Sequence, residues 1–310
     1  MRLVMVLALF LLAISAEAQT RTVALTFDDL PLADAGAPTN AAPTDRLAET
    51  RAVNETILRA LKKHHAPAIA FVNEKKVGDS DAIRKVLGEW VRNDQDLGNH
   101  TFSHLDLDKA SVEEFEKEVI DGEASIKPLM SAAGKPLHYL RFPFNHTGDT
   151  AEKQNGAATF LKQRGYEVAA CTIDGSDFVF ARAYRLMLDN KDAAASVRLR
   201  AAYLDYTRQE IEYYTNLHRQ IFGHEIPHVM LLHASRLNAD TIEQILKLFE
   251  QMKYRFVTLA EAQSDKAYQT PDTYVTAHGP MWGYRWARDL NIKVDGRLEQ
   301  EPPAWVTEYQ

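Results

Sequence analysis

Two histidines four positions apart, His100 and His104, are the first residues of this sequence whose types and spacing suggest chemistry. On a helical turn this spacing points both rings from the same face. Neutral imidazole is the commonest protein ligand of divalent metals, so the pair suits one metal ion. Gly98, just before the pair, allows a sharp change of chain direction. Because most His-x-x-x-His pairs are surface or capping residues, a metal site also requires a third ligand, a base and an acid elsewhere.

An acidic pair, Asp28 and Asp29, directly follows the alternating segment 22–27. That segment predicts a buried strand ending in charge. Neighbouring side chains on a strand point to opposite sides, so the two carboxylates need not share one task. One could bind a metal with His100 and His104 and leave coordination positions open, while the other could take a proton from water. The same dipeptide before Leu-Pro also occurs as a simple turn initiator.

Three further polar residues follow expected strands. Arg141 ends one strand before Pro143, where a guanidinium can hold a carboxylate in two-point geometry. Asp177 lies in the acidic turn 174–178, and His233 ends an apolar strand where it can titrate near neutral pH. Together with the acidic pair and the histidine pair, these residues come from five separate expected strands.

The elements that must position these residues alternate between strand and helix about seven times, which predicts a parallel sheet covered by helices, open or closed into a barrel. Functional residues of such folds collect at the C-terminal ends of the strands. The expected strands cover residues 22–27, 68–72, 96–97, 139–142, 166–173, 228–232 and 254–258. The expected helices cover residues 45–64, 80–91, 111–126, 150–163 and 240–252.

Two segments do not follow this alternation. Residues 179–225 read as mostly helical, and a helical hairpin packed on the barrel is favoured over a substrate lid. Residues 265–310 are rich in aromatic residues, which could stack on sugar rings or cover apolar surface. We expect the second segment to be a C-terminal extension packed on a domain that covers residues 19–264.

The N-terminus reads as a secretory signal peptide over residues 1–18. Arg2 precedes an apolar run over residues 3–14, and an Ala-x-Ala site follows directly. The apolar run is shorter than the about 20 residues that span a bilayer, so a retained membrane anchor is the less favoured alternative. We therefore expect an exported protein, periplasmic or secreted, without stable membrane insertion once the signal is removed.

Composition limits the partners. The chain has a net charge of −7 and no basic run, which argues against nucleic acid as a partner. Its single cysteine, Cys171, lies in an apolar run and is expected to be a small buried hydrophobe without a disulfide. Among the remaining histidines, His146 is the one expected as a possible contact at the rim of the site.

The order of these motifs resembles that of the NodB-homology polysaccharide deacetylases, carbohydrate esterase family 4. The motifs that carry the resemblance are Thr26-Phe27-Asp28-Asp29, His100-Thr101-Phe102-Ser103-His104, Arg141-Phe142-Pro143-Phe144, Asp174-Gly175-Ser176-Asp177-Phe178 and Leu231-Leu232-His233. The resemblance covers residues 21–260, with 179–225 as an insertion. It implies a distorted (β/α) barrel that removes N- or O-acetyl groups from carbohydrates.

The resemblance also implies the roles of the site residues. Asp29, His100 and His104 would hold one divalent metal ion, most often Zn²⁺ in this family.

The catalytic roles implied by the resemblance fall on the other motif residues. Asp28 would be the general base and Arg141 would orient it, while the backbone N–H of Phe144 would help to stabilise the oxyanion. His233 would be the general acid, tuned by Asp177. A nearby carboxylate favours the imidazolium form of such a histidine.

Two motif positions depart from the family pattern. Phe144 stands where the family usually has tyrosine, and Phe178 stands where it usually has tryptophan. If the first position acts through its backbone N–H, its change is harmless, whereas the second makes a smaller pocket wall.

The expected function is therefore a metal-dependent hydrolase that removes acetyl groups from an N-acetylglucosamine-containing polysaccharide or oligosaccharide, such as peptidoglycan or chitin. Two alternatives are an acetyl-xylan esterase of the same family and a non-catalytic carbohydrate-binding protein on this scaffold. A phosphohydrolase built on Asp28 and Asp29 is less favoured, because Pro31 stands where such chemistry wants an aspartate.

Overall fold

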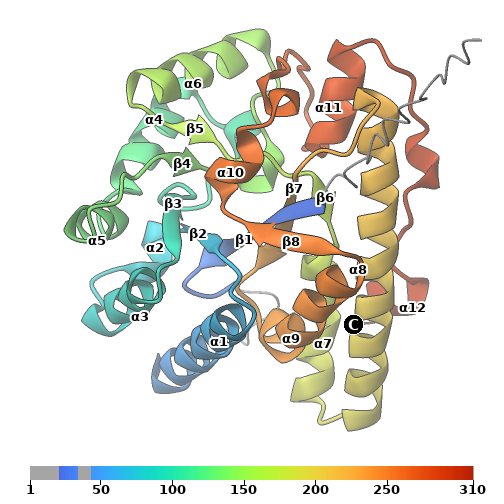
Figure 1. The fold of residues 1–310 in the computed structure, drawn as a ribbon. Helices are drawn as coiled ribbons and strands as arrows, with labels where there is room; N and C mark the ends of the chain where they lie inside the picture. The colour runs from blue at the N-terminus through green and yellow to red at the C-terminus, as the bar shows by residue number, and fades with distance from the viewer. Residues whose placement is uncertain (1–20, 34–42, 310) are drawn as a thin grey trace, which may run out of the picture.

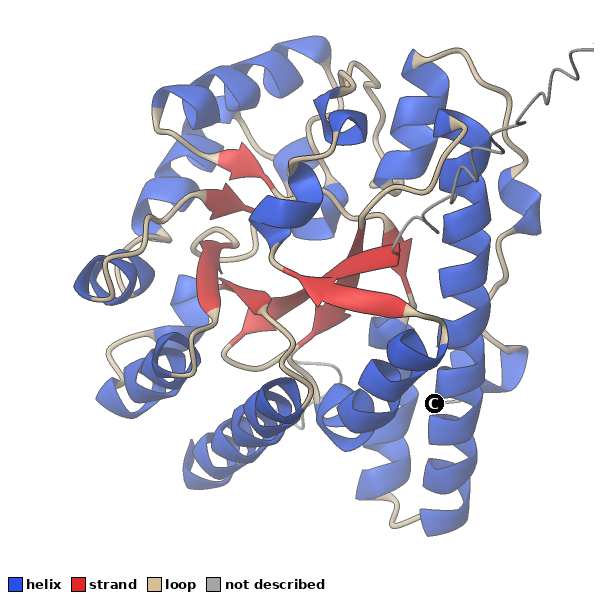
Figure 2. Ribbon diagram, in the orientation of Figure 1, coloured by secondary structure: helices blue, strands red, loops and turns tan. Residues whose placement is uncertain are grey.

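A parallel sheet of eight strands forms half of a barrel, and helices cover its outer side (Figure 1). The computed structural model describes residues 21–33 and 43–309, so the expected signal peptide over 1–18 lies outside the described residues. Figure 2 shows the strands at the centre of the molecule with the helices around them. The strands are β1 (Arg21–Leu30), β2 (Ala68–Val72), β3 (Asp96–Asn99), β4 (Tyr139–Leu140), β5 (Glu167–Val168), β6 (Ile173–Asp174), β7 (His228–His233) and β8 (Tyr254–Val257).

The expected α/β barrel with distorted geometry is confirmed. The strand order is β5-β4-β3-β2-β1-β7-β6, and β8 pairs with β1 outside this order. The helices are α1 (Pro43–Lys63), α2 (Glu74–Val77), α3 (Asp81–Arg92), α4 (Val112–Asp121), α5 (Ile126–Ala132), α6 (Ala151–Gln163), α7 (Asp177–Asp189), α8 (Ala193–Phe222), α9 (Arg236–Gln251), α10 (Leu259–Gln263), α11 (Trp282–Asp289) and α12 (Ala304–Thr307). In the part of the chain that is described, every helix is too short or too polar to cross a membrane.

The central strand β1 has three neighbours. One edge pairs with β7 over residues 23–28, while the other edge pairs first with β8 over 21–24 and then with β2 from residue 25 onward. Because the strands are parallel, the C-terminal ends of β1, β2, β3 and β7 meet at the same rim of the half-barrel. This rim is where the sequence motifs end.

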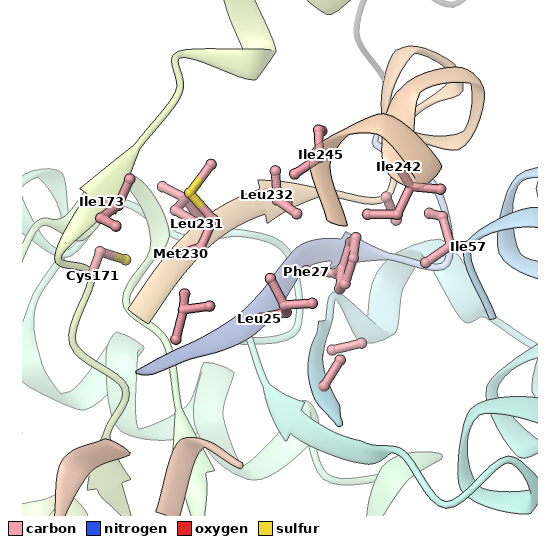
Figure 3. Packing of buried hydrophobic residues seen from close by; sticks show 14 of the residues in the cluster. Leu25, Phe27, Ile57, Cys171, Ile173, Met230, Leu231, Leu232, Ile242 and Ile245 are labelled. Atoms are coloured by element: carbon pink, nitrogen blue, oxygen red, sulfur yellow. The ribbon is translucent and has the colours of Figure 1, made fainter. Parts of the chain in front are cut away.

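Alternate side chains of β1 belong to two different cores. Leu25 and Phe27 pack toward the helical layer, where Ile242 and Ile245 of α9 and Ile57 of α1 meet them (Figure 3). These side chains are almost completely buried, which is the main apolar stabilisation of this layer.

The other face of β1 turns toward the barrel interior. Ala24 packs there in a second apolar cluster with Phe71 of β2 and Val229 of β7. Thr26 and Asp28 continue the same alternation toward the C-terminal end, and both are buried. Because side chains alternate along β1, the carboxylate of Asp28 lies on the inner side of the barrel, near its C-terminal opening.

The prediction of one strand over 166–173 is wrong, because the chain there forms two short strands at opposite ends of the sheet. β5 pairs with β4, whereas β6 pairs with β7. Between them, Ala169 donates its N–H to Leu140 (2.8 Å) and Thr172 donates to Val229 (3.0 Å). One extended segment thus divides its hydrogen bonds between the two ends of an incomplete barrel instead of forming one regular strand.

The helix predicted over 111–126 ends earlier than expected. Its start is confirmed, since Ser111 and Glu114 form a capping box. The helix stops at Asp121, and the backbone N–H and hydroxyl of Ser125 both bind the Glu74 carboxylate (3.1 and 2.6 Å). This buried contact with α2 turns the chain before α5 begins.

The segment 179–225 is a helical hairpin, as expected. Its two helices, α7 and α8, pack on each other and on α9. Tyr203 and Tyr214 on α8 are fully buried, so these tyrosines belong to the core. The C-terminal segment continues this layer, because α11 packs on the end of α8 (Figure 1) and α12 packs on α7.

Candidate functional site

A cavity of about 650 Å³ opens at the rim where β1, β3 and β7 end. It is lined by a set of polar and aromatic side chains that includes Asp28, Asp29, His100, His104, Phe144, Asp174, Phe178 and His233. Arg141 and Asp177 lie behind this surface, fully buried, and contact the residues that line it. The structure therefore brings together the eight residues to which the resemblance gave a metal-binding or catalytic role, which are Asp28, Asp29, His100, His104, Arg141, Phe144, Asp177 and His233.

The two adjacent carboxylates face the same cavity, which corrects the expectation that they point to opposite sides. The pairing of β1 with β2 shifts register between Phe27 and Leu30, and Asp29 has φ 68°. This left-handed conformation reverses the alternation at one residue. Asp28 and Asp29 consequently act on one space, while the pairing of Asp28 with His233 across β1 and β7 is kept.

Asp29, His100 and His104 converge so that their ligand atoms all lie within 4.8 Å of one another. Asp29 Oδ1 is 3.9 Å from His100 Nε2 and 3.6 Å from His104 Nε2. The histidines lie on a loop and not on the helical turn considered above, and left-handed residues at Thr101 and His104 turn the second ring back toward the first. The rings stand edge to face with centroids 4.9 Å apart.

The protonation states of these three groups suit a divalent cation. His100 Nδ1 faces the backbone oxygen of Arg141 at 2.8 Å, which places the ring proton there and leaves Nε2 free to act as a ligand. Burial lowers the pKa of both histidines to about 4. Burial alone would raise the pKa of Asp29, but Lys76 and the histidines lower it to about 2.

The buried atom Asp29 Oδ1 accepts no hydrogen bond, although Lys76 Nζ lies 3.5 Å away. A buried carboxylate oxygen without a hydrogen bond is costly unless a cation compensates it. One carboxylate and two neutral imidazoles are a common donor set for Zn²⁺ with positions left open. These residues therefore fit one divalent metal ion.

Asp28 is held by a buried arginine. Arg141 Nη1 lies 3.3 Å from Asp28 Oδ2, and Nη2 donates to Thr26 Oγ1 at 3.1 Å. The guanidinium also stacks over the ring of Phe71, 4.9 Å from its centroid. Burial raises the pKa of Asp28 above its usual value, and the nearby Arg141 and His233 limit this rise. The arginine thus fixes the orientation of a carboxylate that has an increased affinity for protons.

His233 forms a second oriented pair with Asp177. Asp177 Oδ1 lies 2.6 Å from His233 Nδ1, and Asp177 Oδ2 accepts the backbone N–H of His233 at 2.7 Å. Asn238 on α9 also donates to Asp177 Oδ2 and to the backbone oxygen of His233. Burial alone would lower the pKa of His233, but the Asp177 carboxylate raises it to about 10. The imidazole is therefore charged at neutral pH, and its Nε2 side is left for the cavity.

The loop after β4 presents Phe144 at the rim in a left-handed conformation, with φ 58°. Its ring is half exposed and stands edge to face against His104, with centroids 4.5 Å apart. The C-terminal extension supports this loop from outside. A Cβ at Gly279 would lie 1.8 Å from the Phe144 oxygen, and Arg285 donates to the Asn145 oxygen at 2.7 Å.

Several residues to which the sequence gave no role complete the site. Thr26 and Asn238 orient Arg141 and Asp177, while Lys76 lies beside Asp29. A threonine two positions before Asp28 on the same strand face could have been chosen from the strand period alone. Asn238 follows His233 by five positions at the start of α9, whereas Lys76 lies on α2, and no local pattern marks either of them.

Comparisons with known proteins concern the family and the fold. The polysaccharide deacetylase family model matches residues 15–175, which is more than half of the 310-residue chain. A curated relative is an uncharacterised 30.6 kDa protein in the fumA 3′ region of Geobacillus stearothermophilus. It is 24% identical over 220 residues, which cover 70% of this chain and 68% of that protein.

Solved structures share the fold at low sequence identity. A mutant of peptidoglycan deacetylase PdaC from Bacillus subtilis has a TM-score of 0.51 at 19% identity, covering 81% of this chain and 94% of that one. Polysaccharide deacetylase Bc1974 from Bacillus cereus has a TM-score of 0.51 at 17% identity, covering 77% and 91%. BA3943 from Bacillus anthracis, a CE4 family pseudoenzyme, has a TM-score of 0.50 at 13% identity, covering 79% and 66%. The half-barrel fold agrees with the match to the family model. The chain belongs to the polysaccharide deacetylase family.

Proposed function

We propose that this chain is an active, metal-dependent deacetylase that hydrolyses N-acetyl groups of N-acetylglucosamine-containing glycans. The observation that carries the proposal is the pairing of Asp28 with His233 across β1 and β7 at the mouth of one cavity. Each of the two has its own buried partner. Arg141 favours the ionised form of Asp28, which can accept a proton, and Asp177 favours the imidazolium form of His233, which can donate one.

Asp28 is proposed as the general base. Its carboxylate takes a proton from the water that adds to the acetyl carbonyl carbon, and a raised pKa makes it a stronger base than an ordinary aspartate. Arg141 keeps one oxygen fixed, which leaves Oδ1, an atom without a hydrogen bond, for the water. The same charge keeps the carboxylate ionised before it reacts.

His233 is proposed as the general acid. Its imidazolium donates a proton to the leaving nitrogen as the carbon–nitrogen bond breaks, so that a free amine and acetate are formed. Asp177 holds the ring by Nδ1 and stabilises its charged form. For an O-acetyl substrate, the same proton would go to the leaving alcohol.

Asp29, His100 and His104 would hold a divalent cation, most suitably Zn²⁺. When bound, the cation supplies positive charge that polarises the acetyl carbonyl and lowers the pKa of water. The half-exposed rings of Phe144 and Phe178 flank the cavity and offer apolar faces to a sugar ring. Export to the periplasm or the medium, where peptidoglycan and chitin occur, is part of the proposal.

The test is release of acetate from N-acetylglucosamine oligomers, peptidoglycan and acetyl-xylan by the purified protein. We expect release from the N-acetylated glycans with Zn²⁺ present and loss after treatment with a chelator. Asp28→Asn should abolish release, while Asp240→Asn should keep it, because Asp240 binds Tyr184 and Arg236 and does not line the cavity. If the zinc-loaded protein released acetate from none of these glycans but bound them as tightly as Asp28→Asn, the non-catalytic binding protein would be the correct reading.

A further inference from the structure

A second group of metal-ligating side chains lies beside the first, on the loops that follow β3 and β4. Its members are Asp106, Asp108 and His146, and their ligand atoms all lie within 4.8 Å of one another. His146 Nδ1 is 2.7 Å from Asp106 Oδ1 and 3.2 Å from Asp108 Oδ2. Ligand atoms bound to Zn²⁺ at about 2.0–2.2 Å in tetrahedral geometry lie about 3.3–3.6 Å apart, so small movements would convert this spacing into a first coordination shell.

The buried carboxylate of Asp108 indicates that this group binds a ligand. Its side chain is only 7% exposed, and both carboxylate oxygens are buried without a hydrogen bond to any side chain, although the backbone N–H of Gly148 faces the carboxylate. A buried, ionised carboxylate without hydrogen bonds is strongly unfavourable unless a cation compensates it. Among the described residues, His146 is the only side chain that forms an ion pair with Asp108.

The neighbouring lysines are engaged elsewhere. Lys109 Nζ pairs with Asp106 Oδ2 at 2.9 Å, on the side away from His146. Lys153 Nζ pairs with Asp149 Oδ1 at 3.0 Å and donates to the backbone oxygen of Asp108 at 2.7 Å. Neither ammonium satisfies the side chain of Asp108, which leaves excess negative charge inside the group.

We propose that Asp106, Asp108 and His146 Nδ1 bind a second divalent cation, distinct from the one proposed at Asp29, His100 and His104. Two carboxylates and an imidazole are a donor set that suits Zn²⁺ or Mn²⁺, with water in the open positions. The cation takes the place of the proton on His146 Nδ1 that otherwise joins the ring to Asp106. Because the donors are three residues of this chain, the site does not depend on any substrate.

The second cation would join the loop after β3 to the loop after β4. Phe144 lies between the two groups, with its ring centroid 4.5 Å from that of His104 and 5.5 Å from that of His146. A metal that ties His146 to Asp106 and Asp108 would therefore fix the loop that presents Phe144 to the cavity. This site would be structural, because none of its three donors lines the cavity.

Metal counting tests the proposal independently of catalysis. The purified protein is stripped with a chelator, dialysed against buffered Zn²⁺ and analysed for zinc by mass spectrometry. We expect two zinc ions per chain for the wild type, one for Asp29→Asn, one for Asp108→Asn and none for the double variant. Asp121→Asn, which removes an exposed carboxylate paired with Lys117, serves as the control and should keep two.

A spectroscopic measurement identifies the second site. In the Asp29→Asn background, Co²⁺ should give a d–d absorption band that His146→Gln removes, since the band requires the imidazole ligand. One zinc ion in the wild type, two in Asp108→Asn, or none in Asp29→Asn would each overturn the proposal. Asp108→Asn is isosteric and removes a buried charge, and circular dichroism would confirm that it folds. If Asp108→Asn does not fold, the zinc content of Asp29→Asn still decides the question.

Discussion

Replacing Asp177 by asparagine removes the charge that holds His233 in its imidazolium form. The carboxylate accepts hydrogen bonds from His233 Nδ1 and from the backbone N–H of His233, at 2.6 and 2.7 Å, and another from Asn238. An asparagine has one acceptor oxygen, so its amide group would face at least one of these donors. The variant therefore loses both the charge and the fixed orientation of the ring.

The magnitude follows from the pKa of His233. Burial alone would lower this pKa below its ordinary value of 6.5, but Asp177, with smaller contributions from Asp29 and Asp28, raises it to about 10. Losing that rise corresponds to about 5 kcal/mol of the free energy that favours the imidazolium form. At neutral to slightly alkaline pH the ring would become largely neutral, and loss of general acid catalysis typically costs about 100-fold to 10,000-fold in rate.

The assay is kcat/KM for acetate release from N-acetylglucosamine oligomers as a function of pH. We expect Asp177→Asn to lose activity by about that factor near pH 8 and to recover part of it as the pH falls through the new pKa of His233. Asp240→Asn is the matched control, because Asp240 lies on the same helix as Asn238 but binds Tyr184 and Arg236 instead. A pH profile of Asp177→Asn that coincides with that of the wild type would refute the assigned role.

Three further predictions concern the base, the cavity wall and the core. Arg141→Lys should lower kcat about 10-fold to 100-fold in steady-state assays, since an ammonium cannot bind Asp28 and Thr26 together as the guanidinium does. Phe178→Ala should raise KM for glycan oligomers about 2-fold to 10-fold with little change in kcat, because it removes a half-exposed ring that lines the cavity. The free energy of unfolding should fall as the pH drops below 6.5, by up to about 1.4 kcal/mol per pH unit for His218, because burial lowers its pKa to about 3 in the folded protein while the unfolded chain binds a proton there. Urea denaturation of the wild type and of His218→Gln checks this, and equal slopes for the two proteins would contradict it.

Regular elements of the fold were predictable from the sequence, because periodicity reports burial directly. β1, β7 and α9 follow the expected patterns to within a few residues, and their C-terminal or N-terminal ends set the rim of the site. Placing the motifs at strand ends was enough to predict that they meet, since parallel strands end on the same side. The general arrangement therefore needed no knowledge of tertiary contacts.

The conformations that complete the site were not predictable from local pattern. Asp29, His104 and Phe144 are all left-handed, and none of the three is a glycine, although aspartate and histidine adopt this conformation more readily than phenylalanine. These conformations depend on contacts with distant segments, such as the close approach of Gly279 to the Phe144 oxygen. The division of segment 166–173 between two ends of the sheet has the same origin, because its hydrogen-bond partners are Leu140 and Val229.

His146 shows the intermediate case. Its position after the Arg141 motif marked it as a possible rim contact, but nothing in the local sequence connects it with Asp106 and Asp108. The contact depends on the distance between the loops after β3 and β4, which strand pairing through Asn99 and Leu140 determines. A pair of acidic residues near a histidine motif is common, so only the structure distinguishes this group.

The buried side chain of Arg285 has a practical consequence for engineering this protein by recombination. Arg285 lies 140 positions from Asn145 in the chain, yet it binds the Asn145 oxygen, the hydroxyl of Thr147 and the carboxylate of Asp272. A crossover anywhere between these positions would combine a loop from one parent with a support from another. Chimeric libraries should therefore take residues 141–147 and 272–285 from the same parent. The distance between these two segments in the sequence gives no indication that they form one unit.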